Sequence, residues 1–262
     1  MIKKQYERWL VLPDAQIPYQ DKKTIKAIEK YMVDVANSDH PFDGWLQLGD
    51  LLDFNELSKY NIGYEASIKE EVFETFQAGN AFLDRQQELI RKGNKNARFV
   101  LLQGNHDYRA VDYSLRFPFL RGVLNYERNL KLKERGVEYI KCWEDKSKMF
   151  KLGKAYFTHG NFTGQNHAKK MVDVYAVNVF YGHLHDVQEF PKQIMGTDKT
   201  IVGKSLGCIC DYEQKYMQGN PSNWQQAFSE FYIFPDGFFT EYTTRIFKHR
   251  FVGLNGKVYS GE

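Results

Sequence analysis

The sequence predicts an α/β fold, because short apolar segments alternate with stretches of helical periodicity along most of its 262 residues. Five apolar segments stop abruptly at polar residues, as strands do when they carry side chains to the edge of a sheet. These segments are WLVLPD, GWLQLGD, RFVLLQGNHD, KAYFTHG and NVFYGHLH. Helices are expected at residues 22–36, 66–92, 130–135 and 168–175.

After residue 185 the pattern changes to strands without helices. AFSEFYIF and FFTEYTTRIF flank the turn residues Pro235, Asp236 and Gly237, which predicts a β-hairpin. No linker or internal repeat interrupts the sequence. We therefore expect a single domain over residues 1–262, with a helical insertion at about 55–95 and a β-rich C-terminal part at about 186–262.

Composition argues against several classes of protein. The formal net charge is only +3, so the chain as a whole gives no strong signal for nucleic acid or an anionic membrane. The three cysteines are an odd number without redox or metal-ligand spacing, which suits a reducing compartment. No apolar run approaches the ~20 residues of a membrane span. These features predict an intracellular, cytoplasmic protein and leave its oligomeric state open.

The polar residues at the strand ends are of the types that bind metal ions. In chain order they lie in DAQ at 14–16, GDLLD at 49–53, GNHD at 104–107, HG at 159–160 and GHLH at 182–185. Two divalent ions ~3.5–4 Å apart, bridged by a carboxylate, can activate a water and hold both reacting oxygens of a phosphoryl displacement. The five segments together offer enough ligands for two such ions.

These segments resemble the motifs of the calcineurin-like metallophosphoesterase superfamily, which are D-x-H, G-D-x-x-D, G-N-H-[DE], an isolated His-Gly and G-H-x-H. The resemblance covers Asp14 to His185. Within the superfamily, the sequence resembles phage-encoded and bacterial members, and its motifs resemble those of the repair-nuclease subfamily. It implies a four-layer α/β/β/α sandwich with a dinuclear metal site at the strand-end loops. It also implies hydrolysis of phosphodiester or phosphomonoester bonds by a metal-bridging hydroxide.

Matched position by position, the resemblance implies a role for each polar residue. One ion would be bound by Asp14, Asp50 and His185, and the other by Asp50, Asn105, His159 and His183. Asp50 would then bridge the two ions. His106 would protonate the leaving oxygen, with Asp107 orienting its ring, while Asp53 would organise its loop.

Gln16 stands where the family usually has histidine. An amide oxygen ligates hard cations but is neutral and donates less strongly than imidazole, so the ion near Asp14 is expected to be the more exchangeable one. Mn²⁺ is the expected metal, with Mg²⁺, Fe and Zn²⁺ as alternatives. Gln16 could instead hydrogen-bond to a bound water or serve only its own loop.

The stretch at residues 108–154 contains twelve Lys/Arg and six Asp/Glu, a local charge of +6. Its cations and rings alternate as they would along a single nucleic-acid strand, and Arg109 is a candidate substrate ligand. The alternative is a solvated helix whose aromatic residues belong to the core. Nucleic acid is therefore one candidate partner, and a small nucleotide is the other.

Other side chains outside the motifs are candidates for substrate contact. His167, at the start of an expected helix, could reach a phosphate, or could be a surface residue. Tyr212, Tyr216 and Trp224 follow the last motif and could stack a base or anchor their own loop. A different class of protein also fits the fold, namely a non-catalytic scaffold that uses its surface for partners.

Overall fold

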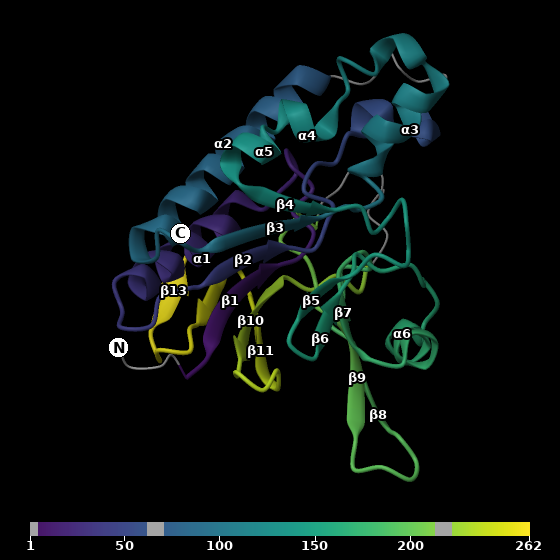
Figure 1. The fold of residues 1–262 in the computed structure, drawn as a ribbon. Coiled ribbons are helices and arrows are strands. Elements are labelled where there is room, and N and C mark those ends of the chain that lie inside the picture. Colours follow the sequence, from purple (N-terminus) through teal and green to yellow (C-terminus); the bar gives the residue numbers. More distant parts are fainter. Residues whose placement is uncertain (1–4, 62–70, 213–221) are drawn as a thin grey trace.

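The computed structural model describes residues 5–61, 71–212 and 222–262. Its larger sheet has six strands in the order β11-β10-β1-β2-β3-β4 (Figure 1). Four neighbouring strands of this sheet are parallel to one another. They are β1 (Glu7–Leu12), β2 (Gly44–Gln47), β3 (Arg98–Leu102) and the edge strand β4 (Val137–Ile140). The hairpin of β10 (Ala227–Ile233) and β11 (Phe239–Arg245) pairs antiparallel with β1.

The second sheet has five strands in the order β5-β6-β7-β9-β8. They are β5 (Phe150–Leu152), β6 (Ala155–Phe157), β7 (Asn178–Tyr181), β8 (Glu189–Gln193) and β9 (Thr200–Ser205). The strands β6, β7 and β9 are parallel to one another. A separate hairpin of β12 (Arg250–Val252) and β13 (Val258–Ser260) lies near the C-terminus.

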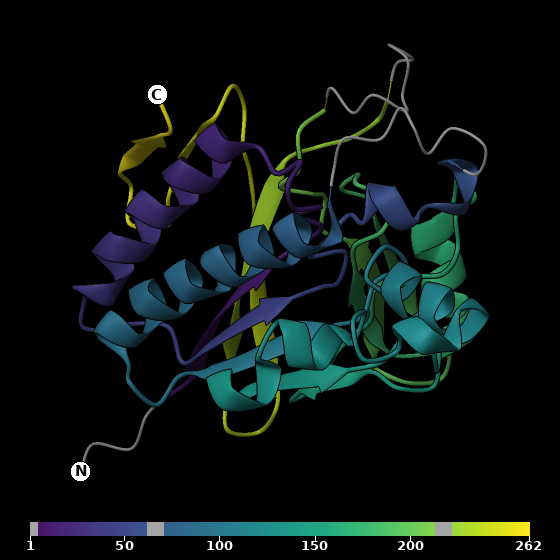
Figure 2. The ribbon, with the colours of Figure 1, turned by 90° about the horizontal axis from the view of Figure 1, so that it is seen from above.

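Two long helices, α1 (Lys22–Ala36) and α2 (Val72–Gly93), lie side by side on one face of the six-stranded sheet (Figure 2). Helix α1 begins where the carboxylate of Asp21 accepts hydrogen bonds from the backbone amides of Lys23 and Thr24. Shorter helices follow β3, namely α3 (Tyr108–Arg116), α4 (Tyr126–Asn129) and α5 (Leu132–Arg135), and 3-10 turns occupy residues 55–57, 59–61 and 118–120. Helix α6 (His167–Tyr175) lies beside the five-stranded sheet.

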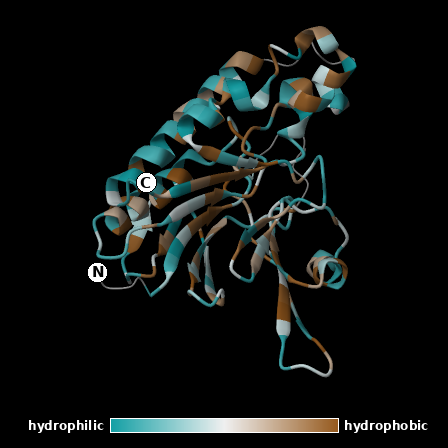
Figure 3. Ribbon diagram, in the orientation of Figure 1, coloured by the Kyte–Doolittle hydropathy of each residue, from teal (hydrophilic) through white to brown (hydrophobic). Residues whose placement is uncertain are grey.

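Strand β1 is buried on both faces, and its alternate side chains enter different cores. Leu10 and Leu12 pack with residues of α1 and α2, whereas Trp9 and Val11 pack with residues of the five-stranded sheet. The second cluster therefore joins the two sheets face to face. Because β1 is buried on both faces, its sequence is a continuous apolar run. Figure 3 shows the central strands as largely hydrophobic.

A third, smaller cluster covers the other face of the five-stranded sheet. Met171 of α6 packs there against Val179 and Tyr181 of β7. Helix α6 thus covers the face of the five-stranded sheet that is turned away from the second cluster.

The α/β class predicted from the sequence is confirmed, and the helix expected at 22–36 has those bounds. The second expected helix is present as α2, and the start expected at residue 66 lies outside the described residues. The sequence did not indicate β8, because Pro191 interrupts its pattern. Proline is tolerated there because β8 is an edge strand.

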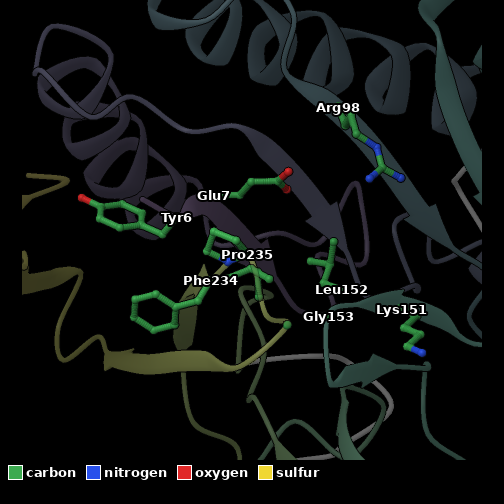
Figure 4. A pocket seen from close by; sticks show the side chains of 10 residues that line it. Tyr6, Glu7, Arg98, Lys151, Leu152, Gly153, Phe234 and Pro235 are labelled. Carbon is green, nitrogen blue, oxygen red and sulfur yellow. The ribbon is translucent and has the colours of Figure 1, made fainter. Parts of the chain in front are cut away.

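A pocket of about 460 Å³ opens at the end of the larger sheet where β1 and β3 begin (Figure 4). Glu7, Arg98, Lys151 and Phe234 are among its lining residues. It lies at the opposite ends of these strands from the motif residues, so it is separate from the candidate site. Within the described parts of the chain, no helix combines the length and the apolar character needed to cross a bilayer.

Candidate metal centre

All five motif segments follow the C-terminal end of a strand. Asp14, Asp50 and Asn105 come after the parallel strands β1, β2 and β3, while His159 and His183 come after β6 and β7 of the other sheet. Because parallel strands end at the same edge, the two packed sheets bring these loops together. His185 ends the last of the loops.

One group of candidate ligands surrounds His159. Its Nε2 lies 2.9 Å from Asn105 Oδ1 and 3.3 Å from Asp50 Oδ2, and its Nδ1 lies 2.8 Å from the carbonyl oxygen of Leu48. A carbonyl can only accept, so Nδ1 donates its proton there. Nε2 can then donate a proton to the two oxygens when the ring is charged, or a lone pair to a cation when the ring is neutral. His183 completes the group, since ligand atoms of Asp50, His159 and His183 lie close enough together to hold one metal ion.

The second group is built on Asp14. Its Oδ1 lies 3.3 Å from His185 Nε2, and both of its oxygens accept a hydrogen bond from the backbone amide of His183 at 3.0 Å. Ligand atoms of Asp14, Asp50 and His185 lie within 4.8 Å of one another, as do those of Asp50, His159 and His183. Asp50 therefore belongs to both groups.

Gln16 lies against the second group. Its side-chain Nε2 is 3.4 Å from His185 Nε2. Its Oε1 is buried and has no hydrogen-bond partner in the described part of the chain. A buried amide oxygen without a partner costs free energy, so a cation or a bound water at this place would satisfy it.

The electrostatics of the centre favour a cation. Burial acts to raise the pKa of Asp50, but the adjacent His159 and His106 outweigh it and hold that pKa far below its usual range. Burial opposes the charged form of His159 and His185, yet Asp50 and Asp14 respectively raise each pKa to about 9. Burial and the nearby His159 lower the pKa of His183 to about 4. The buried carboxylates thus draw positive charge, which a divalent ion can supply in place of imidazolium protons.

The backbone at four candidate ligands is left-handed. The φ angles are 49° at Gln16, 49° at Asp50, 74° at His183 and 63° at His185. Such angles in residues other than glycine are uncommon and gather at functional sites.

Two glycines permit the close approach of these loops. A Cβ on Gly104 would lie 2.0 Å from Asp50 Oδ1, and a Cβ on Gly182 would lie 2.0 Å from Asp14 Oδ2. Both distances are far below van der Waals contact, so the carboxylates occupy the space that only glycine leaves open.

His106 faces the first group, with its Nε2 3.9 Å from Asp50 Oδ2. Its Nδ1 lies 3.0 Å from Asp53 Oδ2 and 3.2 Å from the Asp53 carbonyl oxygen. Burial disfavours its charged form, but Asp50 and Asp53 outweigh this and raise the pKa of His106. Arg109, a predicted substrate ligand, lies beside it, with Nη2 3.3 Å from His106 Nε2 and Nη1 2.8 Å from the Asp53 carbonyl oxygen.

The expectation that Asp107 orients the ring of His106 is wrong, because Asp53 holds that position. Asp107 is fully buried and turned toward the core. Its Oδ1 accepts from the Leu52 amide at 3.0 Å and from the Tyr126 hydroxyl at 2.7 Å, and its Oδ2 accepts from the Gly104 amide at 2.9 Å. Asp107 therefore joins the GDLLD and GNHD loops, and burial together with the charge of Asp50 raises its pKa to about 6.

His167 is neither a surface residue nor a free phosphate ligand. It is buried at the start of α6, with Nδ1 2.7 Å from the Tyr181 hydroxyl and Nε2 3.1 Å from Asp186 Oδ2. Both ring nitrogens of His167 have a hydrogen-bond partner because α6 packs against β7. The position of His167 in the sequence did not indicate this packing.

Several residues near the centre were not indicated by the sequence. The Trp143 ring lies 5.7 Å from that of His159 and 5.4 Å from that of His183, and Lys146 Nζ lies 3.1 Å above Trp143. Lys146 Nζ is buried without a hydrogen-bond partner among the described residues, and burial lowers its pKa to about 8. These residues come from an irregular loop, where no periodicity marks a position.

Two cysteines also border the centre. Cys210 Sγ lies 3.8 Å from His185 Nδ1, and Cys208, Cys210 and His185 place three possible ligand atoms within 4.8 Å of one another. The cysteines were expected to lack any metal-ligand arrangement, since their sequence spacing gives none. In the folded chain, His185 from the loop after β7 lies beside the two cysteines and provides the third possible ligand.

The basic stretch from residue 108 has a mixed character. Tyr126 is buried and stacks on Tyr139, whereas Phe117 and Phe119 are 41% and 79% exposed. Arg116 forms an ion pair with Asp112. Some aromatic residues of this stretch thus belong to the core and others lie on the surface, and nucleic acid as a partner stays a prediction.

The candidate base-stacking residues differ in their surroundings. The Tyr212 hydroxyl accepts a hydrogen bond from the Gln226 amide at 2.6 Å, and the Trp224 ring lies 4.2 Å from that of His185. Tyr216 lies outside the described residues.

Comparisons with known proteins identify phage relatives. The chain is 24% identical over 239 residues to the Gene 54 protein of Mycobacterium phage L5, covering 85% of this chain and 88% of the relative. It is 24% identical over 238 residues to the Gene 54 protein of Mycobacterium phage D29, with coverage of 85% and 87%. No protein-family model matches the sequence.

Among solved structures, the chain is similar to the structure of Vacuolar Protein Sorting 29 from Cryptosporidium parvum. The alignment has a TM-score of 0.42 and 12% identity, and it covers 93% of this chain and 99% of the other.

Proposed function

We propose that the protein is a dinuclear metal-dependent phosphoesterase of the calcineurin-like type. The observation that carries the proposal is the pair of ligand groups that share Asp50, with His106 Nε2 3.9 Å from the shared carboxylate. A bridging carboxylate between two ligand sets is what two-ion phosphoryl transfer requires. The single domain and the four-layer α/β/β/α arrangement are part of the same proposal.

One of the two proposed ligand sets offers mostly oxygen donors, and the other offers oxygen and nitrogen donors in equal number. Asp14, Gln16, Asp50 and His185 would hold one ion, and Asp50, Asn105, His159 and His183 the other. Mn²⁺ or Mg²⁺ suits the carboxylate and amide oxygens, with Zn²⁺ and Fe as alternatives. When bound, the ions supply Lewis acidity toward the phosphoryl oxygens and lower the pKa of water.

His106 is the proposed general acid. Its raised pKa favours the protonated ring, and the Asp53 carboxylate accepts from Nδ1 so that Nε2–H is directed at the leaving oxygen. Arg109 Nη2, 3.3 Å from His106 Nε2, is placed to hold a non-bridging oxygen of the same phosphate.

A nucleic-acid strand is the favoured substrate, and a small nucleotide is the alternative. The exposed rings of Phe117 and Phe119 come shortly after the GNHD loop, in the stretch with the local charge of +6. Binding through many phosphates weakens steeply as salt rises, so oligonucleotide affinity should fall with a steep log–log slope. A shallow slope would favour the small nucleotide.

The phage relatives support a phage-encoded enzyme that works inside a bacterial host. A reducing cytoplasm agrees with the three free cysteines, all buried.

The proposal is tested by hydrolysis of bis-p-nitrophenyl phosphate, p-nitrophenyl phosphate and single- and double-stranded DNA with Mn²⁺. Asp50→Asn should lower the rate by at least about 10³-fold, because it weakens the shared ligand of both ions. Asp39→Asn, at an exposed position, is the matched control. Tight Mn²⁺ binding without hydrolysis of any substrate would instead identify a non-catalytic scaffold.

A further inference from the structure

Two buried cysteines, Cys208 and Cys210, lie beside the imidazole ring of His185. Both cysteines are 0% exposed, and His185 is 3% exposed. One possible ligand atom from each of the three residues lies within 4.8 Å of the others, and Cys210 Sγ is 3.8 Å from His185 Nδ1. We call these three residues the thiol-histidine cluster.

The backbone after β9 holds both thiols toward His185. Cys208 and Cys210 each form a β-bridge to another segment, so the chain is extended at both residues. Side chains two residues apart in an extended segment point to the same face. Between the cysteines, the amide of Ile209 donates to the carbonyl oxygen of Asp14 at 2.9 Å, which ties this segment to the loop after β1.

The two ring nitrogens of His185 face different partners. Nε2 lies 3.3 Å from Asp14 Oδ1, and a carboxylate can only accept, so Nε2 carries a proton in this arrangement. Nδ1 is the nitrogen that lies beside Cys210 Sγ. A histidine that binds a metal commonly donates its other ring N–H to a carboxylate, which fixes the ring for the ion. Asp14, His185 and the thiols have this arrangement.

The separation of the donors also suits a metal ion. Zinc lies about 2.3 Å from a thiolate sulfur and about 2.0–2.1 Å from an imidazole nitrogen. At tetrahedral or trigonal angles, these bond lengths place sulfur and nitrogen about 3.5–3.8 Å apart. The observed distance from Cys210 Sγ to His185 Nδ1 is 3.8 Å, so an ion could bind both atoms without a large movement of either residue.

Burial of the cluster does not oppose such an ion. Two thiolates in the interior need a compensating positive charge, and a divalent ion provides it. The cluster adjoins the candidate metal centre through His185, which belongs to both groups of ligand atoms. An ion that reaches the metal centre therefore comes within one imidazole ring of the thiols.

We propose that the thiol-histidine cluster binds one thiophilic divalent ion, of the class of Zn²⁺ and Cd²⁺, through Cys208 Sγ, Cys210 Sγ and His185 Nδ1. Two thiolates and an imidazole select soft ions over Mn²⁺ or Mg²⁺. The ion would replace the protons of both thiols and any proton on Nδ1, and these protons pass to the solvent. Binding at the cluster does not depend on the proposed function.

The shared histidine gives this site a consequence for the metal centre. A neutral imidazole has one lone pair, so His185 serves one ion through Nδ1 or another through Nε2, but not both. A soft ion in the cluster should therefore weaken the binding of the proposed ion near Asp14. This consequence rests on the proposed function, and it is tested separately below.

Cadmium binding to the reduced full chain is followed by ultraviolet absorption, because cadmium–thiolate bonds give a charge-transfer band that oxygen and nitrogen ligands do not. We expect one equivalent of Cd²⁺ to saturate this band. Cys208→Ala and Cys210→Ala should each lower the affinity at least about tenfold and remove about half of the band. The matched control is Cys142→Ala, whose thiol is also buried but donates to the Gln103 carbonyl oxygen at 3.3 Å. This control should keep the wild-type band and affinity.

The proposed site is overturned if the folded, reduced wild type gives no thiolate band with Cd²⁺, or if Cys142→Ala loses as much of the band as the cluster variants. Circular dichroism establishes that each variant is folded. The titration of the wild type needs no variant, so the site can be rejected even where an alanine variant does not fold.

The link to the metal centre is measured by electron paramagnetic resonance of free Mn²⁺. One equivalent of Cd²⁺ should weaken the more exchangeable Mn²⁺ site at least about tenfold in the wild type and have little effect in Cys210→Ala. An equal effect in both proteins would place Cd²⁺ at the dinuclear centre itself and reject the shared use of His185. A normal thiolate band in a protein that binds no Mn²⁺ would reject the proposed function and leave the soft-metal site standing.

Discussion

Asp53 Oδ2 lies 3.0 Å from Nδ1 of His106, and the Asp53 carbonyl oxygen is 3.2 Å from the same nitrogen. Two acceptors from one residue therefore fix the ring that faces Asp50. Asp107, although it follows His106 directly, points into the core. The two carboxylates near the proposed acid thus have different roles. Asp53 fixes the imidazole ring of His106, and Asp107 joins the two loops.

Replacing Asp53 by asparagine should impair leaving-group protonation. We expect kcat to fall by about 10–100-fold for an alkyl phosphoester and much less for a p-nitrophenyl ester, whose leaving group needs little protonation. Asp53 helps to raise the pKa of His106, so its loss lowers that pKa. An acid must be protonated to act, so the decline of rate at high pH should move to lower pH. A pH–rate profile that does not move would contradict this role.

Asp107→Asn should act on stability instead. The change weakens charge-assisted hydrogen bonds from the Tyr126 hydroxyl and two backbone amides, and should lower the free energy of unfolding by about 1–3 kcal/mol. Urea denaturation measures it. Tyr126→Phe should show a loss of the same sign, whereas Tyr242→Phe at a half-exposed position is the control.

Gln16→His should strengthen one metal site and leave the other unchanged. Imidazole donates more strongly than an amide, and His185 already lies beside this position. We expect the weaker of two Mn²⁺ dissociation constants to fall by about tenfold, as changes around metal ligands commonly produce shifts of this size. Calorimetric titration gives both constants, and Gln193→His on the edge strand β8 is the control. Equal constants in the wild type and Gln16→His would make Gln16 a bystander.

Gly104→Ala should disrupt metal binding, because the added methyl group would overlap the Asp50 carboxylate. The increase in melting temperature that Mn²⁺ gives the wild type should be largely lost, since ligand binding stabilises the folded state in proportion to affinity. Gly122→Ala meets no atom within 4 Å and should change the free energy of unfolding by less than about 0.5 kcal/mol. A Gly104→Ala protein that keeps the full Mn²⁺ effect would show that Asp50 is not a ligand.

Asp21 offers a test of pH dependence away from the metal centre. Burial acts to raise its pKa, but hydrogen bonds from Thr24 and Gln226 and the charge of His249 outweigh this and lower it. A lowered pKa means that the stabilisation is complete above the ordinary value and is lost as pH falls through the folded-state value. Asp21→Ala should cost about 1 kcal/mol at pH 7, and the difference from the wild type should shrink toward pH 3. Thermal unfolding at both pH values measures this.

The strand-end rule predicted much of the candidate site, because each apolar run that stopped at Asp, Asn or His is a strand whose C-terminal end carries that residue. Sequence order alone could not show how the loops turn. Asp53 and Asp107 both lie near His106, and only the backbone direction decides which carboxylate reaches the ring. His167 was misjudged for a similar reason, since its burial depends on how α6 docks on β7.

Residues from irregular loops were the least predictable. Trp143 and Lys146 lie in a turn without hydrophobic periodicity, and their contact with the histidines comes from the packing of two sheets. Cys208 and Cys210 are separated from His185 by more than twenty residues, and they meet it only through the folded chain. Such meetings depend on tertiary structure and leave no local pattern.

The left-handed backbone at Gln16, Asp50, His183 and His185 has a consequence for the order of events in the cell. Each such residue costs about 1–3 kcal/mol, and the packed strands on either side supply that free energy during folding. We therefore expect the packed strands to hold these loops in shape without an ion, so that the proposed ions would bind to a preformed scaffold. The ion content of such a protein would follow the surrounding metal concentrations rather than the history of its folding.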